Sequence, residues 1–196
     1  MKLKVVAGFC AAVAMAPAAS LAQTGKPGEA VEYRVLATSK TSTMQSEMQA
    51  ASREGYRYGG VMGGETSFGG SEVVVVMIKD AAPERYDYRL LATNKTSTMQ
   101  KEIQEAGDAG YEYRGQTVFK SAFGGNEVVV ILERERTSPS GARFEYRLLA
   151  TKKTATLQKE LSDAGAQGFS FIGLTVANTA MGGTEVVAIL RRQAAR

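Results

Sequence analysis

The sequence contains no histidine and no tryptophan, and its only cysteine, Cys10, lies close to the N-terminus. Without histidine, neither a Ser-His-Asp triad nor a Cys-His pair can be built. Zinc, copper and haem sites generally use imidazole or thiolate ligands. No stretch has the alternating Asp/Asn positions and final Glu of a calcium loop. The sequence therefore predicts no catalytic residue, no metal and no cofactor, and we expect a protein that is not an enzyme.

Neither sign of charge dominates the chain, which has 24 Lys and Arg, 20 Asp and Glu, and a formal net charge of +4. Basic and acidic residues are interleaved along it. Proteins that bind nucleic acid usually concentrate their basic residues in one patch. We therefore expect no nucleic-acid partner.

The N-terminus has the pattern of a secretory signal peptide. Lys2 and Lys4 precede an apolar stretch at residues 5–19, and Ser20-Leu21-Ala22 fits the small-x-small cleavage rule. Cleavage before Gln23 would lower the formal net charge from +4 to +2, because it removes both lysines. The apolar stretch is short for a membrane span, so we expect no stable span after cleavage, with an uncleaved anchor as the alternative. The predicted location is periplasmic or secreted.

A pattern of about fifty residues occurs three times, which indicates an array of one supersecondary unit. The motif Tyr33-Arg34-Val35-Leu36-Ala37-Thr38 returns at residues 88–93 and 146–151. All four prolines lie outside the repeats, as expected for residues that break helices and central strands. The predicted parts are a signal peptide (1–22), a flexible lead-in (23–30), repeat 1 (31–80), a linker (81–85), repeat 2 (86–133), a linker (134–143) and repeat 3 (144–193).

Each repeat begins with a predicted strand, residues 33–38 in repeat 1, followed by a helix. Met44, Met48 and Ala51 have the spacing of one helical stripe. The hydroxyl cluster Thr41-Ser42-Thr43 is placed to cap the start of the helix. Glycines that suit a left-handed position follow each helix, at Gly55, Gly110 and Gly168.

Two more strands complete the unit. The second carries two aromatic residues on one face, Tyr56 and Tyr58 in repeat 1. The third is continuously apolar, which predicts burial on both faces. The fold class is α+β: three tandem βαββ repeats with mixed sheets, each with one helix on a face. Because units of this size are marginal alone, we expect a pseudo-threefold packing of the repeats or a homo-oligomer, against the alternative of three loosely strung domains.

The segments Glu32-Tyr33-Arg34-Val35 and Arg53-Glu54-Gly55-Tyr56 flank the predicted helix of repeat 1. This arrangement resembles a bacterial family of small βαββ domains of unknown function, whose signature is a Y-E-Y-K-V strand and a later L-N-x-L-G-x-E-G-W-E-L. The chain departs from the signature where the family has Trp, since Tyr56, Tyr111 and Phe169 stand there. The resemblance implies the fold and no activity.

The turn between the first strand and the helix is the best candidate for a ligand site. It offers hydroxyls, an ammonium group and a helix N-terminus, which together favour an anion. The alternative is capping with a solvated lysine. The candidate residues are Lys40, Thr41, Thr43, Lys95, Thr96, Thr98, Lys153, Thr154 and Thr156.

The Gly-Gly-x-Glu segments and the aromatic pairs of the second strands each have a structural and a functional interpretation. Gly-Gly-x-Glu segments, 69–72 in repeat 1, form turns or let a ligand approach the backbone. Their glutamates are expected to pair with the arginines of the first strand, such as Arg34. The aromatic pairs are expected in the core rather than on a stacking surface for sugars or bases.

The absence of a catalytic residue set and the threefold repetition favour an exported, non-enzymatic scaffold that binds a protein or a component of the cell envelope. The first alternative is a periplasmic protein that binds a small anion. The second is an enzyme that works without histidine or cysteine.

Overall fold

Within the residues that the structure describes, three helices and nine strands follow one another in the order expected for three βαββ repeats. The computed structural model describes residues 30–66, 70–79, 85–120, 126–137, 142–178 and 183–194. Residues 31–196 form one compact unit. The predicted signal peptide, most of the lead-in and the first glycine of each Gly-Gly pair lie outside the described residues.

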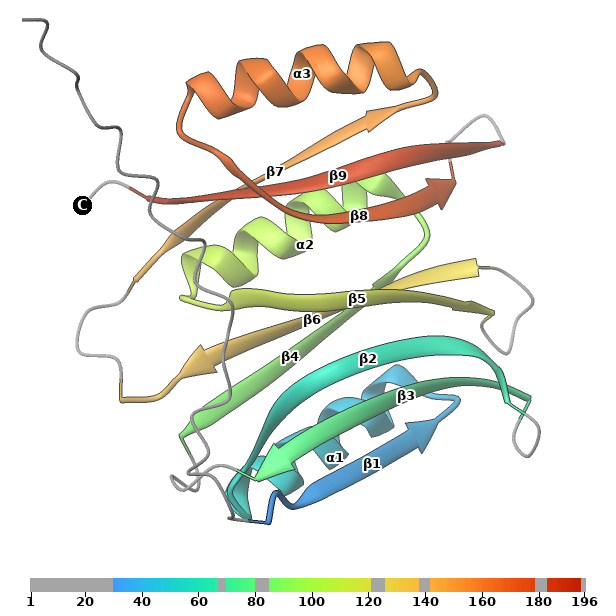
Figure 1. The fold of residues 1–196 in the computed structure, drawn as a ribbon, viewed down its shortest axis with the longest axis vertical. Helices are drawn as coiled ribbons and strands as arrows, with labels where there is room; N and C mark the ends of the chain where they lie inside the picture. Colours follow the sequence, from blue (N-terminus) through green and yellow to red (C-terminus); the bar gives the residue numbers. More distant parts are fainter. Residues whose placement is uncertain are drawn as a thin grey trace, which may run out of the picture. The chain divides into compact units, whose positions relative to one another are not determined.

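The elements, coloured along the sequence in Figure 1, have the following bounds. They are β1 (Tyr33–Thr38), α1 (Thr41–Arg53), β2 (Tyr56–Thr66), β3 (Gly70–Lys79), β4 (Tyr86–Thr93), α2 (Thr96–Asp108), β5 (Glu112–Lys120), β6 (Asn126–Glu135), β7 (Phe144–Thr151), α3 (Thr154–Ala166), β8 (Ser170–Asn178) and β9 (Thr184–Gln193). β6 reaches into the segment predicted as the linker 134–143.

Each repeat forms its own three-stranded sheet, with strand orders β1-β3-β2, β4-β6-β5 and β7-β9-β8. We call these sheets 1, 2 and 3. The third strand of each repeat lies between the first two and pairs with both in antiparallel fashion. The α+β class and the three βαββ repeats are confirmed. The expected mixed sheet is wrong, because the two strands joined by the helix run in the same direction but never pair.

The helices form where the apolar stripe predicts them, and Met44, Met48 and Ala51 are fully buried. The predicted hydroxyl caps are wrong: the N-cap residues are Lys40, Lys95 and Lys153, and no side chain caps these helices. Instead, the threonine hydroxyl two residues before each lysine accepts a hydrogen bond from its backbone N–H. The glycines that end the helices do adopt positive φ, as predicted.

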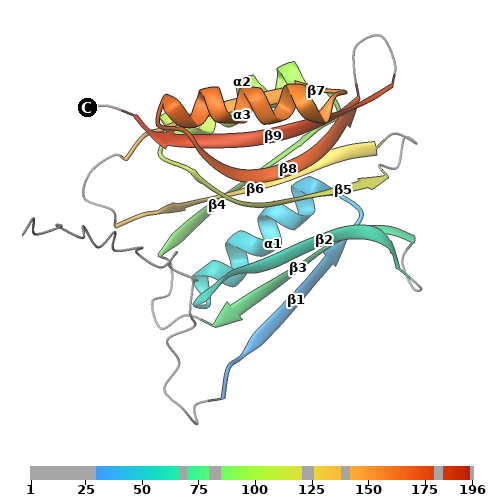
Figure 2. The ribbon, with the colours of Figure 1, turned by 45° about the horizontal axis from the view of Figure 1, so that its top comes forward.

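The sheets and helices stack in chain order: sheet 1, α1, sheet 2, α2, sheet 3, α3. Figure 2 shows α1 between the strands of repeat 1 and those of repeat 2. α1 contacts β4 as well as its own sheet, α2 contacts β7, β2 lies against β5, and β5 lies against β8. The expected pseudo-threefold packing and the alternative of loosely strung domains are both wrong, because consecutive repeats pack together into an open stack.

The position of a repeat in the stack decides how its third strand is buried. In β6 the residues Val128 to Leu132 are buried on both faces, and in β9 the residues Val187 to Leu190 are as well. In β3 burial alternates, since Val73, Val75 and Met77 face α1 and their neighbours are only half-buried. Burial on both faces was predicted for all three strands and holds only where a preceding repeat covers the second face.

The second strand of each repeat contains one extra residue, a β-bulge, at the same place. The register with the neighbouring strand shifts between Tyr58 and Gly60, between Tyr113 and Gly115, and between Phe171 and Gly173. Because one residue is unpaired, side chains three positions apart lie on the same face of the sheet.

Candidate functional site

The predicted anion-binding turns lie at the N-terminal ends of α1, α2 and α3, which follow one edge of the stack (Figure 1). Lys40, Lys95 and Lys153 are exposed there. In repeat 2 the hydroxyl of Thr96 donates to the carboxylate of Glu185 at 2.6 Å, which places a negative charge beside the start of α2. The turn of repeat 2 therefore contacts repeat 3, and the anion site stays a prediction.

The expected pairing of strand arginines with the Gly-Gly-x-Glu glutamates is wrong for two arginines. Arg34 forms an ion pair with Glu54, at the end of α1. Arg147 donates to the side chain of Gln167, at the corresponding place after α3. Both arginines therefore hold the end of their own helix to the first strand.

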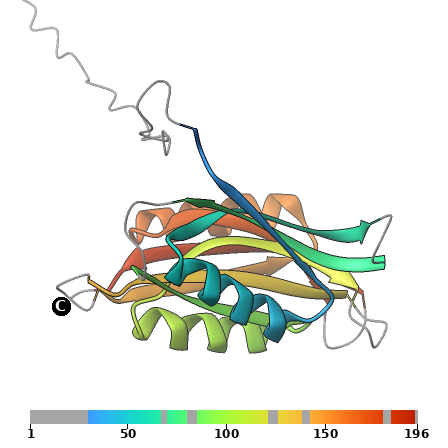
Figure 3. The ribbon, with the colours of Figure 1, turned by 90° about the horizontal axis from the view of Figure 1, so that it is seen from below.

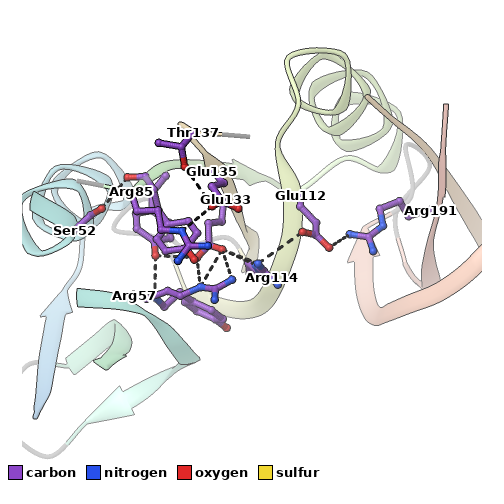
Figure 4. A network of polar contacts seen from close by, with 12 residues as sticks. Ser52, Arg57, Arg85, Glu112, Arg114, Glu133, Glu135, Thr137 and Arg191 are labelled. Atoms are coloured by element: carbon purple, nitrogen blue, oxygen red, sulfur yellow. Dashed lines mark hydrogen bonds and ion pairs between the residues drawn. The ribbon is translucent and has the colours of Figure 1, made fainter. Parts of the chain in front are cut away.

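A hollow of about 480 Å³ opens on repeat 2 and is lined by charged residues of both signs. Glu133 belongs to its lining, and its side chain is only 2% exposed. Arg57 of repeat 1 donates to Glu133 at 2.9 Å and Arg114 donates at 2.7 Å, while the Tyr88 hydroxyl donates at 2.9 Å (Figure 4). Two guanidinium groups and a phenol therefore satisfy this buried carboxylate.

The network continues from Glu133 into repeat 3. Glu112 lies opposite Glu133 in the sheet, and Arg114 is placed between the two carboxylates. Glu112 in turn pairs with Arg191, which stands on β9 (Figure 4). The alternating charges thus connect all three repeats through the middle one.

Further carboxylates at the hollow are held as anions. Asp87 lies 3.0 Å from Arg134 and 2.7 Å from Arg136. Burial opposes the ionisation of Asp87, but the hydrogen bonds from the two arginines outweigh it and lower its pKa. The hydrogen bond from Arg85 likewise lowers the pKa of Glu135. A general acid needs a raised pKa, so these paired carboxylates are suited to joining strands rather than to moving protons.

Among the described residues, no cluster of three or more His, Cys, Asp or Glu side chains is arranged to hold a metal ion.

The same part of the chain contains no helix with the length and apolar character needed to cross a membrane.

The contact between consecutive repeats, which we call a join, is built twice, and a tyrosine is buried at each. Tyr88 is 4% exposed, and its hydroxyl accepts from the backbone N–H of Tyr58 at 2.8 Å. Tyr146 is 3% exposed, and its hydroxyl accepts from the N–H of Tyr113 at 2.7 Å. In both joins the first strand of one repeat therefore inserts a phenol into the second strand of the repeat before it.

Glutamines on the helix form the second part of a join. At the first join Gln45 accepts from the N–H of Leu90 at 2.8 Å. Gln49 accepts from the N–H of Tyr88 at 3.0 Å and donates to the carbonyl of Tyr86 at 3.3 Å. β4 is an edge strand, whose outer backbone groups have no neighbouring strand. The side-chain amides of α1 supply the missing partners.

The second join repeats this arrangement with α2 and the edge strand β7. Gln100 accepts from the N–H of Leu148 at 2.8 Å and donates to the carbonyl of Tyr146 at 3.0 Å. Gln104 accepts from the N–H of Tyr146 at 2.8 Å and donates to the carbonyl of Phe144 at 3.2 Å. The same two helix positions therefore bind the backbone of the next repeat in both joins.

Glycines complete each join by letting aromatic groups approach closely. A Cβ at Gly115 would collide with the phenol of Tyr58, and a Cβ at Gly173 with the phenol of Tyr113. A Cβ at Gly107, on α2, would collide with the ring of Tyr146. The glycine after the bulge in repeats 2 and 3 thus receives an aromatic side chain from the preceding repeat.

At the two ends of the stack the same positions have no partner among the residues that the structure describes. The sheet end is the face of sheet 1 turned away from α1, where Tyr33 is 57% and Val35 is 64% exposed, and where a Cβ at Gly60 would meet nothing. The helix end is formed by α3 and β8, where Phe171 is 56% exposed and a Cβ at Gly165 would meet nothing. Figure 3 views the stack from the sheet end, with β1 in the foreground.

In the described chain, the large hydrophobic side chains that stay exposed all belong to repeat 1 or repeat 3. They are Val31, Tyr33, Val35 and Met62 at the sheet end, and Phe171, Leu174 and Val176 at the helix end. The exposed Phe171 contradicts the expected burial of the aromatic pairs. Apolar patches on a soluble protein commonly mark an interaction site, so the end faces are the candidate site.

The sequence contained signals for the joins that were not recognised as such. Glutamine recurs at the same helix position in Gln45, Gln100 and Gln158, off the apolar stripe. Glu133 directly follows an uninterrupted apolar strand, where a charge needs a buried partner.

The comparisons with known proteins add no relative. No protein family matches the sequence, and no curated protein and no solved structure is similar to it at a significant level. The resemblance to small βαββ domains therefore stays a prediction.

Proposed function

We propose that this protein is an exported, non-enzymatic scaffold that binds partners through the two end faces of its repeat stack. The observation that carries the proposal is the confinement of the exposed large hydrophobic residues to repeats 1 and 3. Side chains at the equivalent positions in the joins are buried or half-buried, and large hydrophobic ones are exposed only at the ends. The paired carboxylates around Glu133 and the lack of histidine support a role without catalysis.

Export to the periplasm or beyond is part of the proposal, and the basic and apolar pattern of residues 1–22 supports it. We also propose membership in the family of small βαββ domains. The order strand, helix, strand, strand in each repeat supports that assignment.

Site-specific photocrosslinking in intact cells tests the proposed function. A photoreactive amino acid replaces Tyr33 at the sheet end or Phe171 at the helix end, and Lys101 serves as control because its side chain is 79% exposed on α2. We expect discrete adducts from both end positions and none from Lys101. Adduct patterns that are the same at all three positions, or no adduct at the ends, would overturn the proposal.

A further inference from the structure

The residues at the two end faces of the stack correspond to the two halves of a join. A join brings together the forward side of one repeat, with its helix glutamines and the aromatic residue before the bulge, and the backward side of the next repeat. The backward side supplies a tyrosine on the first strand and the glycine after the bulge. The described residues form both joins, and at each end of the stack they leave one half of a join uncovered.

At the sheet end, each backward residue of the joins has an exposed counterpart. Tyr33 corresponds to the buried Tyr88 and Tyr146 through the repeated motif. Gly60 follows the bulge as Gly115 does, but nothing lies within 4 Å of a Cβ placed on it. The space that Tyr58 occupies over Gly115 is thus vacant over Gly60.

At the helix end, the forward residues are exposed in the same way. Phe171 stands before the bulge of β8, where Tyr58 and Tyr113 stand in the other repeats. Gln158 occupies the position of Gln100 and is exposed. Leu157 and Leu161 of α3 are only partly buried, whereas Met99 and Ile103 of α2 are fully buried. Among the described residues, no further sheet covers α3 as sheet 2 covers α1 and sheet 3 covers α2.

We propose that the helix end of one copy docks onto the sheet end of a second copy and forms a third join between chains. This inference rests on the proposed function, since it makes the end faces binding surfaces and names their partner as another copy of the same chain. Phe171 packs over Gly60 of the second copy, Tyr33 of that copy inserts beside α3 and β8, and Gln158 binds the backbone of its edge strand β1.

The charges of the two ends are compatible with this contact. The first join pairs Arg57 with Glu133, and the second pairs Glu112 with Arg191. The corresponding residues at the ends are Ser170 and Ile78, so no buried charge is left without a partner. An unpaired buried charge is the commonest obstacle to such a contact, and here it does not arise.

The contact between chains is weaker than the joins within the chain. Ser162 stands where Gln49 and Gln104 provide the second amide, and its hydroxyl donates to the carbonyl of Gln158 within α3. The third join therefore has one glutamine rather than two, which suits an assembly that depends on protein concentration.

The contact is heterologous, because a different surface of each copy takes part. Such a contact leaves one helix end and one sheet end free after every addition, so copies add head to tail into an open filament or, if the rotation closes, a ring.

Light scattering after gel filtration tests the proposal on the chain that begins at Gln23. Val35→Glu blocks the sheet end and Phe171→Glu blocks the helix end, each by one charge on an exposed side chain. Gly60→Leu blocks the sheet end without a charge. Ser97→Glu, on the exposed side of α2, is the matched control.

We expect the mass of the unmodified chain and of Ser97→Glu to rise with concentration, and each blocked variant to keep the mass of one chain. Mixing Val35→Glu with Phe171→Glu should give complexes of two chains and no larger, because each variant retains the end that the other lacks. Thermal unfolding of every variant checks that loss of assembly is not loss of the fold.

Three results would overturn the inference: a single-chain mass for the unmodified protein up to about 1 mM, assembly that persists in Phe171→Glu, or no complex in the mixture. A single-chain mass for the unmodified protein leaves the proposed function standing if photocrosslinking at Tyr33 and Phe171 still captures a different protein. Absence of both self-assembly and crosslinks removes the inference and the proposed function together.

Discussion

Tyr33, Tyr88 and Tyr146 open the same motif, but only the last two are buried. The three strands have nearly the same sequence around the tyrosine and the same place in their own sheets. The difference comes from the preceding repeat, which covers Tyr88 and Tyr146, whereas none of the described residues covers Tyr33 in this way. The comparison shows that the motif encodes the contact between repeats as well as the fold of a single repeat.

The largest contrast is expected from truncating these tyrosines. Tyr88→Ala removes a buried ring and its hydrogen bonds, so we expect the free energy of unfolding to fall by about 3–5 kcal/mol. Tyr33→Ala should change it by less than about 0.5 kcal/mol, because the side chain is exposed. Urea unfolding of both variants in the Phe171→Glu background avoids effects of self-assembly. Equal losses for the two would mean that Tyr33 is also buried in solution.

The charge network gives the next contrast. Glu133→Ala leaves Arg57 and Arg114 without their shared carboxylate, so we expect a loss of about 3 kcal/mol in the free energy of unfolding. Glu105→Ala, on the surface of α2, is the control and should cost less than about 0.5 kcal/mol. The loss on Glu133→Ala should persist at high salt, since buried pairs are screened little. A loss that salt abolishes would place Glu133 at the surface.

Two equivalent helix glycines should respond with opposite signs. Gly107→Ala drives a Cβ into Tyr146 and should lower stability by about 1–3 kcal/mol. Gly165→Ala meets open space at the end of the stack and should raise stability by about 0.5–1 kcal/mol, since alanine favours a helix. Thermal unfolding of the two variants, again in the Phe171→Glu background, measures the difference. Stabilisation by Gly107→Ala would contradict the close packing of the second join.

The smallest expected difference is in how the free energy of unfolding changes at alkaline pH, with and without the hydroxyl of Tyr146. Burial raises the pKa of Tyr146 from 10.0 to about 12. Below pH 10 the phenol is neutral in both states, and its contribution to stability is complete. As the pH rises from about 10 to 12, the unfolded state ionises first and stability is lost, by about 1 kcal/mol at about pH 11. Tyr146→Phe should show a shallower loss, measured by urea unfolding between about pH 9 and 11, and an equal slope would refute the assignment.

Local patterns were sufficient to predict the helices and strands. The spacing of Met44, Met48 and Ala51 and the glycine after the helix act within a few residues of one another, and both behave as predicted. The helix start was mispredicted because Thr38 takes the backbone N–H of Lys40, so the hydroxyls that follow are not the cap. The choice between nearby hydroxyls depends on the geometry of the preceding strand.

The strand order and the joins depend on contacts that local patterns do not contain. The placement of β3 between β1 and β2 arises from pairing across the whole repeat. Gln45 and Gln49 bind a strand of the next repeat, and Arg57 binds Glu133 in repeat 2. Their sequence context is that of ordinary surface residues. The candidate site was missed for the same reason, since Tyr33 and Phe171 become informative only when their buried counterparts are known.

The bulge in the second strand of each repeat decides which side chains beyond it face the next repeat and which face the preceding one. Tyr58 and Val61 face the next repeat together only because one unpaired residue, Gly59, lies between Tyr58 and Gly60. Deleting Gly59, or the corresponding Arg114 or Ile172, would turn the remaining half of the strand over and exchange its forward and backward residues. A change in the length of this segment is therefore tolerated only in steps of two residues, and an odd change would uncouple one repeat from the next while leaving its hydrogen-bonded sheet intact.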